Sequence, residues 1–147
     1  MESWRKGWRV GFAPQISDEA LAALKVALEE DDARLMQGAT TSPPPLQFVQ
    51  DWPVEAACVL GFCGVVEHGG FQTEDNPHGA TVAQAEEFFA KACFAADQNL
   101  GDPAACRWFL NWFDETPRAE MRGLLLVEVI GEQERRAAPA ESGVAAA

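Results

Sequence analysis

Two histidines and four cysteines are the residues in this chain whose types could bind a metal. In chain order, Cys58, Cys63, His68 and His78 supply the ligand types of a zinc site. Structural zinc sites, however, use close ligand pairs on turns, spaced by about two to four residues. Here the first three ligands follow one another at steps of five residues, which on a helix separates successive ligands by about 140°. They cannot converge from one helix face, so we expect no metal and no other cofactor.

Nucleophilic catalysis is also poorly supported by the sequence. The four cysteines all lie within apolar stretches: Cys58, Cys63, Cys93 and Cys106. Burial in such surroundings raises a thiol pKa and favours an inert, small hydrophobic side chain. The short signatures of zinc proteases, serine hydrolases and dinucleotide-binding enzymes do not occur. A small enzyme that uses His68 or His78 with a nearby carboxylate stays open as an alternative.

The loop sequence TEDNPHG, residues 73–79, is rich in polar ligand types. It lacks the alternating acidic positions and the terminal Glu of a calcium-binding loop. We therefore expect a turn held by its own hydrogen bonds.

Charge is distributed unevenly along the chain. The formal net charge is −12, and no Lys or Arg occurs between Arg34 and Lys91, although acidic residues continue through that stretch. Such a negative field repels phosphate backbones, which argues against direct nucleic-acid binding by the main domain. It favours a partner protein with a basic surface. An inhibitor that occupies the nucleic-acid-binding surface of a target protein is the second hypothesis.

One aromatic residue is predicted to lie on the polar side of its helix. Phe94 departs from the apolar face of the segment 82–100 and falls near Glu87 and Lys91. Together with Glu74 and Asp75 of the acidic loop, these residues are the candidate partner-binding site. An aromatic anchor with a polar rim is typical of protein interfaces.

Two other segments carry alternatives. Residues 1–15 form a predicted arm, in which the alternation of Trp8, Val10 and Phe12 favours a short extended segment; a basic aromatic handle for a partner is the alternative. The loop GATTSPPPLQFVQ, residues 38–50, favours a rigid proline strut. Its alternative is a docking strip for an aromatic groove of a partner.

The helices are predicted from their caps and their periodicity. Ser17 opens a helix that continues to Gly38, and Asp51 with Pro53 opens a second helix through His68. Small residues on one side of the second helix, Gly61 and Gly64 among them, predict the close approach of another backbone.

The later helices follow the same cues. Thr81 with Gln84 forms a capping-box signature for residues 82–100, which Gly101 closes. Two further helices begin at Pro103 and Pro117, and the last three helices are expected to be antiparallel neighbours. Residues 124–130 fit a helix or a strand.

The aromatic cluster RWFLNWF, residues 107–113, looks at first like a binding surface. On a helix its aromatic and aliphatic side chains cover most of the circumference, and a narrow strip is left for Arg107, Asn111 and Asp114. We therefore interpret the cluster as part of the core, with this strip facing water.

These features predict an all-α protein: a single compact domain of about five helices at residues 16–133, with an N-terminal arm at 1–15 and a disordered tail at 134–147. No apolar run reaches the length of about 20 residues that a membrane-spanning helix needs, and no leader segment is evident, which favours a cytoplasmic protein. The leading hypothesis is a non-catalytic, acidic protein-binding module, an adaptor or accessory subunit of a larger complex.

Overall fold

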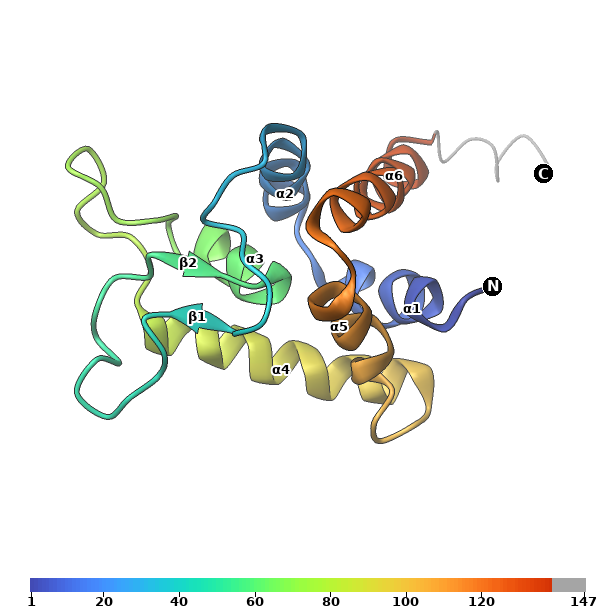
Figure 1. Ribbon diagram of the computed structural model, residues 1–147, viewed down its shortest axis with the longest axis horizontal. Helices are drawn as coiled ribbons and strands as arrows, with labels where there is room; N and C mark the ends of the chain where they lie inside the picture. Colours follow the sequence, from blue (N-terminus) through green and yellow to red (C-terminus); the bar gives the residue numbers. More distant parts are fainter. Residues whose placement is uncertain (139–147) are drawn as a thin grey trace.

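The computed structural model describes residues 1–138, and within them the fold is all-α, as predicted. The α-helices are α1 (Ser3–Lys6), α2 (Asp18–Glu30), α3 (Val59–Glu67), α4 (Val82–Leu100), α5 (Cys106–Glu115) and α6 (Arg118–Ala137). A π-helical segment, η1 (Gly7–Phe12), and a 3₁₀ turn, η2 (Ala13–Gln15), follow α1. Two short antiparallel strands, β1 (Thr41–Ser42) and β2 (Ala56–Ala57), complete the structure. Helix α4 runs along the molecule, and the other helices lie on one side of it (Figure 1). No helix within residues 1–138 has the length and apolar character needed to cross a bilayer.

The N-terminal segment is helical and belongs to the core, so the expected extended arm is wrong. Trp4, Trp8 and Phe12 recur every four residues and are all buried, which is the period of one helix face. Val10, which the extended interpretation placed with them, is 40% exposed. A Cβ at Gly7 would lie 3.1 Å from the Phe109 Cβ. The absence of a side chain there lets η1 pack directly against α5.

Helix α2 begins as predicted but ends early. The Ser17 hydroxyl accepts a hydrogen bond from the Ala20 amide, and the helix stops at Glu30 rather than near Gly38. Asp31 takes the left-handed conformation, with φ 53°. Asp and Asn tolerate this conformation better than most residues. The chain then leaves the helix axis, and Leu35 is buried from a non-helical segment.

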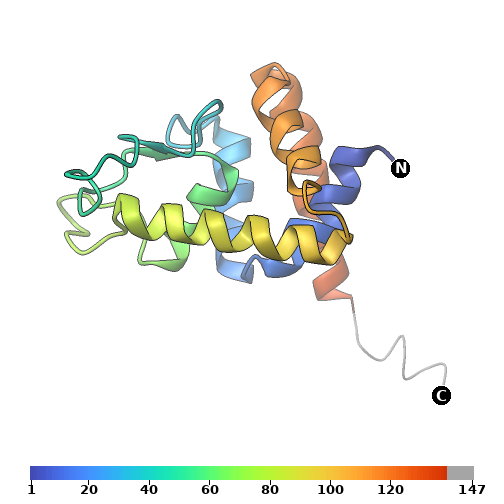
Figure 2. The ribbon, with the colours of Figure 1, turned by 90° about the horizontal axis from the view of Figure 1, so that it is seen from below.

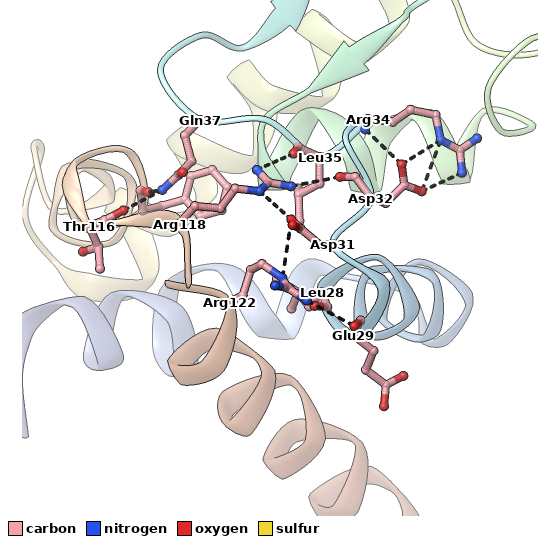
Figure 3. Close-up of polar contacts among 11 residues, drawn as sticks. Leu28, Glu29, Asp31, Asp32, Arg34, Leu35, Gln37, Thr116, Arg118 and Arg122 are labelled. Atoms are coloured by element: carbon pink, nitrogen blue, oxygen red, sulfur yellow. Dashed lines mark hydrogen bonds and ion pairs between the residues drawn. The ribbon is translucent and has the colours of Figure 1, made fainter. Parts of the chain in front are cut away.

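Two arginines of α6 cap the end of α2 (Figure 3). Arg118 donates to the carbonyls of Asp32 and Leu35, at 3.0 and 2.9 Å, and pairs with the Asp31 carboxylate at 2.6 Å. Arg122 donates to the Leu28 carbonyl at 2.9 Å. Arg122 thus satisfies carbonyl groups in the last turn of α2, which the helix itself leaves without partners. Arg118 fixes the segment that follows the helix. The Arg118 hydrogen bond holds the pKa of Asp31 below its usual range.

The second predicted helix begins later than expected. Residues 56–57 form β2, and Cys58 is the N-cap of α3, its sulfur accepting from the Gly61 amide at 3.5 Å. The predicted close approach of another backbone is confirmed at Gly61, and a side chain fills the corresponding space at Gly64. A Cβ at Gly61 would lie 2.8 Å from the Thr40 carbonyl oxygen, and one at Gly64 would lie 2.7 Å from the Phe88 Cβ. Helix α4 therefore packs against the glycine side of α3.

In the C-terminal half, the predicted helices are present, but they pack against different neighbours from those predicted. The capping box of Thr81 and Gln84 is present, and Gly101 ends α4 with φ 70°. Helix α5 starts at Cys106 rather than at Pro103, and residues 124–130 are helical within α6. Helix α6 packs chiefly on α2, rather than on α5 as expected. It continues to Ala137, past the predicted start of the tail, and residues 139–147 of that tail lie outside the described residues.

The aromatic cluster of α5 is part of the core, as interpreted from the sequence. Phe109 and Phe113 are fully buried. Phe109 lies 5.3 Å from Trp8 and 5.6 Å from Phe12, measured between ring centroids. Trp112 stacks on Trp4 with centroids 3.7 Å apart. We call these rings the core aromatic cluster: Trp4, Trp8, Phe12, Phe109, Trp112 and Phe113.

Candidate protein-docking surface

Two loops extend from one end of the molecule, the end that carries the N-terminus of α4, and their tips point apart (Figures 1 and 2). They are residues 43–53 and residues 69–80, and we call this end the loop face. Backbone hydrogen bonds fix the first loop against the start of α4: the Val82 amide donates to the Trp52 carbonyl at 2.9 Å, and the Ala83 amide donates to the Gln50 carbonyl at 2.8 Å. The loop face is therefore an ordered part of the fold.

Three large apolar side chains of the first loop are exposed. Phe48 is 76% exposed, Trp52 is 52% and Leu46 is 50%. The loop nevertheless has internal order, because the Val49 amide donates to the Leu46 carbonyl and the Trp52 amide donates to the Val49 carbonyl, both at 3.0 Å. Val49 itself is buried and anchors the loop. The backbone thus holds the three apolar side chains outward on a fixed support.

The second loop presents two carboxylates at its tip. The backbones of Thr73 and Asn76 exchange hydrogen bonds of 3.0 and 3.1 Å, and the Asn76 side chain donates to the Gly69 and Phe71 carbonyls at 2.8 Å. This self-bonded turn is the one predicted for the segment, and it leaves Glu74 and Asp75 exposed at its end.

The electrostatic character of the loop face is negative. Its acids are Asp51, Glu74 and Asp75, with Glu55 next to the first loop, and neither loop contains a Lys or an Arg. The nearest cation before them in the chain, Arg34, is paired with Asp32 at 2.7 Å and lies over the Phe71 ring at 4.8 Å. The loop face therefore carries exposed apolar groups on one loop and carboxylates on both, and none of these carboxylates forms an ion pair within the described residues.

The predicted Phe94 site lies further along α4. Phe94 is 66% exposed, and it lines a shallow hollow of about 400 Å³ with Asp97, Gln98 and the loop 101–103. Glu87 and Lys91 form an exposed ion pair of 2.8 Å, which lowers the pKa of Glu87. Both occupy the same side of α4 as Phe94, close to one another at helical spacing.

The structure thus divides the five predicted partner-binding residues between two places. Glu74 and Asp75 lie on the loop face, whereas Glu87, Lys91 and Phe94 lie along α4. The strongest apolar groups of the loop face, Leu46, Phe48 and Trp52, are absent from the predicted site. Their signal in the sequence is large apolar residues inside a proline-rich loop, where no helical or strand period provides a buried face. The docking-strip alternative for residues 38–50 included two of them.

The cysteines and histidines provide no site of comparable quality. Within residues 1–138, no group of His, Cys, Asp and Glu is arranged to hold a metal ion. All four cysteines are free, and burial raises the pKa of the Cys58 thiol to about 12, as it does for Cys93. Both imidazoles are exposed, and the His68 Nδ1 lies 2.8 Å from the Gly64 carbonyl oxygen.

No protein-family model matches this chain, and neither a curated protein nor a solved structure shows significant similarity to it.

Proposed function

We propose that this chain is a non-catalytic, cytoplasmic protein-binding module, an adaptor or accessory subunit, and that it docks on its partner through the loop face. The observation that carries the proposal is the exposure of Leu46, Phe48 and Trp52 on a hydrogen-bonded loop. The four free cysteines fit a reducing compartment, where thiols stay unpaired.

The loop face has the composition of a docking surface. Trp and Phe are enriched among the residues that contribute most to binding, and a polar rim excludes water around them. Exposed apolar side chains that lie together are a common mark of interaction sites. Because backbone hydrogen bonds already order the loop, less conformational entropy is lost on association than for a flexible segment.

The charge of the loop face indicates the chemistry of the partner. Both loops carry carboxylates, and neither contains a Lys or an Arg that would offset them. A complementary surface would place an apolar pocket for Phe48 and Trp52 inside a rim of Lys and Arg side chains. Charge pairs of this kind steer association and are weakened by salt.

The test is purification of the protein with its partner from the source cell, followed by reconstitution of the complex from the two purified components. We expect the double variant F48A/W52A to weaken binding at least tenfold, since both anchors are lost. We also expect affinity to fall as NaCl rises from 50 to 500 mM. Calorimetry or interferometry measures both effects.

The matched control is Phe94→Ala, which removes a ring of intermediate exposure, 66% against 76% for Phe48 and 52% for Trp52, from the other surface. It should leave the affinity within about twofold of the wild type. Loss of binding in F94A with full binding in F48A/W52A would move the site to α4. The proposal would be overturned if neither F48A/W52A nor F94A changed the affinity for the partner. It would also be overturned if the protein stayed monomeric without a partner at every salt concentration.

A second candidate function follows from the same negative field. If the basic surface of the partner is the one with which it binds nucleic acid, the chain acts as an inhibitor that occupies that surface. Competition settles this point: added nucleic acid should displace the chain from the reconstituted complex, and the F48A/W52A variant should inhibit less. A ternary complex with nucleic acid would exclude the inhibitor and leave the adaptor role.

A further inference from the structure

A second recess lies away from the loop face, between α4, α5 and the segment 38–40. Its volume is about 240 Å³. Besides that segment, its walls are Cys58, Phe89, Arg107, Leu110, Asn111 and Asp114. We call it the α4–α5 cleft. The polar strip of α5 is exposed, as the sequence predicted, and it lines this cleft.

The strip places opposite charges at the two ends of the cleft. Arg107 and Asp114 are separated by two turns of α5, roughly 10 Å of helix rise, and Asn111 lies between them. Within residues 1–138, the Arg107 guanidinium forms no ion pair and no hydrogen bond with a side chain. It is therefore available to a carboxylate from outside the protein.

The Asp114 end is held in place by the neighbouring backbone. One Asp114 oxygen accepts from the Gly38 amide at 3.0 Å. The Gln37 side chain donates to the carbonyls of Phe113 and Thr116, at 2.6 and 2.8 Å, so the segment that carries Gly38 is fixed to the end of α5 (Figure 3). The other Asp114 oxygen makes no hydrogen bond within the described residues, and it can receive a cation.

The middle of the cleft is apolar. Phe89 and Leu110 are half-buried and pack against the core, and they form the walls between the two charged ends. The Cys58 thiol there is neutral, because burial raises its pKa to about 12. A chain of methylene groups suits these walls, whereas a second charge in the middle does not.

We infer that the α4–α5 cleft binds a small, elongated zwitterion: a molecule with a carboxylate for Arg107 and Asn111 at one end and a protonated amine or guanidine for Asp114 at the other, joined by methylene groups. Small-molecule sites combine apolar walls with a few convergent polar groups in this way. The cleft is smaller than the roughly 300–1,000 Å³ typical of sites for drug-sized ligands, which limits the ligand to the size of a free basic amino acid.

The test is an NMR or calorimetric titration of the full-length protein with L-lysine, L-arginine and 6-aminohexanoate. We expect saturable binding of at least one of the three. We expect binding at least tenfold weaker for pentylamine and for hexanoate, each of which carries one of the two charges. Arg107→Gln and Asp114→Asn should each weaken the zwitterion at least tenfold. The amide introduced by Asp114→Asn keeps an oxygen for the Gly38 amide, so the backbone support is retained.

Two control variants separate the cleft from general electrostatic attraction. Glu115→Gln changes an exposed acid on the same helix, and Glu74→Gln changes one on the loop face; both should leave zwitterion binding unchanged. The inference is overturned if none of the three zwitterions binds saturably, if pentylamine binds as tightly as they do, or if Arg107→Gln and Asp114→Asn leave binding intact. Each of these outcomes is independent of whether F48A/W52A affects a protein partner.

Discussion

The molecule contains two groups of aromatic side chains with opposite environments. In the core aromatic cluster, Phe109 is fully buried and Trp112 stacks on Trp4. On the loop face, Phe48 and Trp52 are mostly exposed. The first group lies on helices with a repeating apolar face, and the second lies on a loop whose hydrogen bonds go to its own backbone and to α4. Aromatic content alone therefore does not distinguish a core from an interface in this chain.

The charges around the two groups differ as well. Arg5 and Arg9 lie beside the core aromatic cluster, and both pair with the buried carboxylate of Glu128 on α6. Arg9 makes two hydrogen bonds to it, at 2.7 and 3.0 Å. On the loop face the carboxylates have no such partners within the described residues. Charges next to the buried rings are thus satisfied within the protein, whereas those next to the exposed rings are open to an external partner.

Replacing a Phe by Ala should have its largest effect on stability in the core aromatic cluster. Phe109→Ala removes a fully buried ring that contacts Trp8 and Phe12, and we expect the free energy of unfolding to fall by about 3–5 kcal/mol, the usual cost of such a cavity. Urea unfolding followed by circular dichroism measures the change. A loss below about 1 kcal/mol would show that the cluster does not support the core.

A smaller effect is expected at the ion pair beside the core. Glu128 is 4% exposed, and replacing it by Gln leaves Arg9 without its carboxylate, whereas Arg5 keeps its pair with Glu2. Because both arginines retain access to water, the expected loss is about 1–2 kcal/mol at pH 7, less than for a fully buried pair. Arg135→Ala, which breaks an exposed pair with Glu132 on the same helix, is the control and should change stability by less than about 0.5 kcal/mol.

The stabilising effect of the Glu128 ion pair should decrease as the pH falls. The Arg9 hydrogen bond holds the pKa of Glu128 below its usual range. A carboxyl group with a lowered folded-state pKa stabilises the protein above its unfolded pKa, about 4.3, and this contribution is lost as pH falls through the folded value. The stability difference between wild type and Glu128→Gln should therefore be largest near neutral pH and shrink in acid. A difference that stays constant down to pH 3 would contradict the ion pair.

The smallest effect on stability is expected on the loop face. Phe48→Ala and Trp52→Ala should each change the free energy of unfolding by less than about 0.5 kcal/mol, as is usual for exposed positions. The same urea experiment measures this change. A loss above about 1.5 kcal/mol in either variant would mean that the side chain packs on the protein, and the contrast between the two aromatic groups would then disappear.

The sequence predicted the helix ends that are fixed by local contacts, that is, by a capping side chain or by a glycine next to the last turn. The caps at Ser17 and Thr81 and the left-handed Gly101 are of this kind. The end of α2 was not predictable in this way, because Arg122, which binds the Leu28 and Glu29 carbonyls, and Arg118, which binds the segment after the helix, come from the far end of the chain. The start of α3 was missed because β2 depends on pairing with β1.

The candidate site was predicted only in part, because some of its features depend on local sequence and others on contacts with distant segments. An acidic, cation-free stretch is visible in the sequence, and Phe94 was placed on the polar side of α4 by its helical phase alone. Leu46, Phe48 and Trp52 follow no period, so their exposure depends on where the loop is anchored. That anchor is a set of hydrogen bonds to residues 80–83, which lie far along the chain.

Composition, helical period and the count of charges were enough to predict the all-α class, the burial of the α5 aromatic residues and the negative charge of residues 35–90. Which side chains of the N-terminal segment and of the loops stay uncovered was settled by tertiary packing. That packing buried Trp4, Trp8 and Phe12, left Phe48 and Trp52 in solvent, and placed the polar strip of α5 over a cleft. The physical reason is that exposure depends on which distant segments pack against a residue, and a local pattern contains no information about those partners.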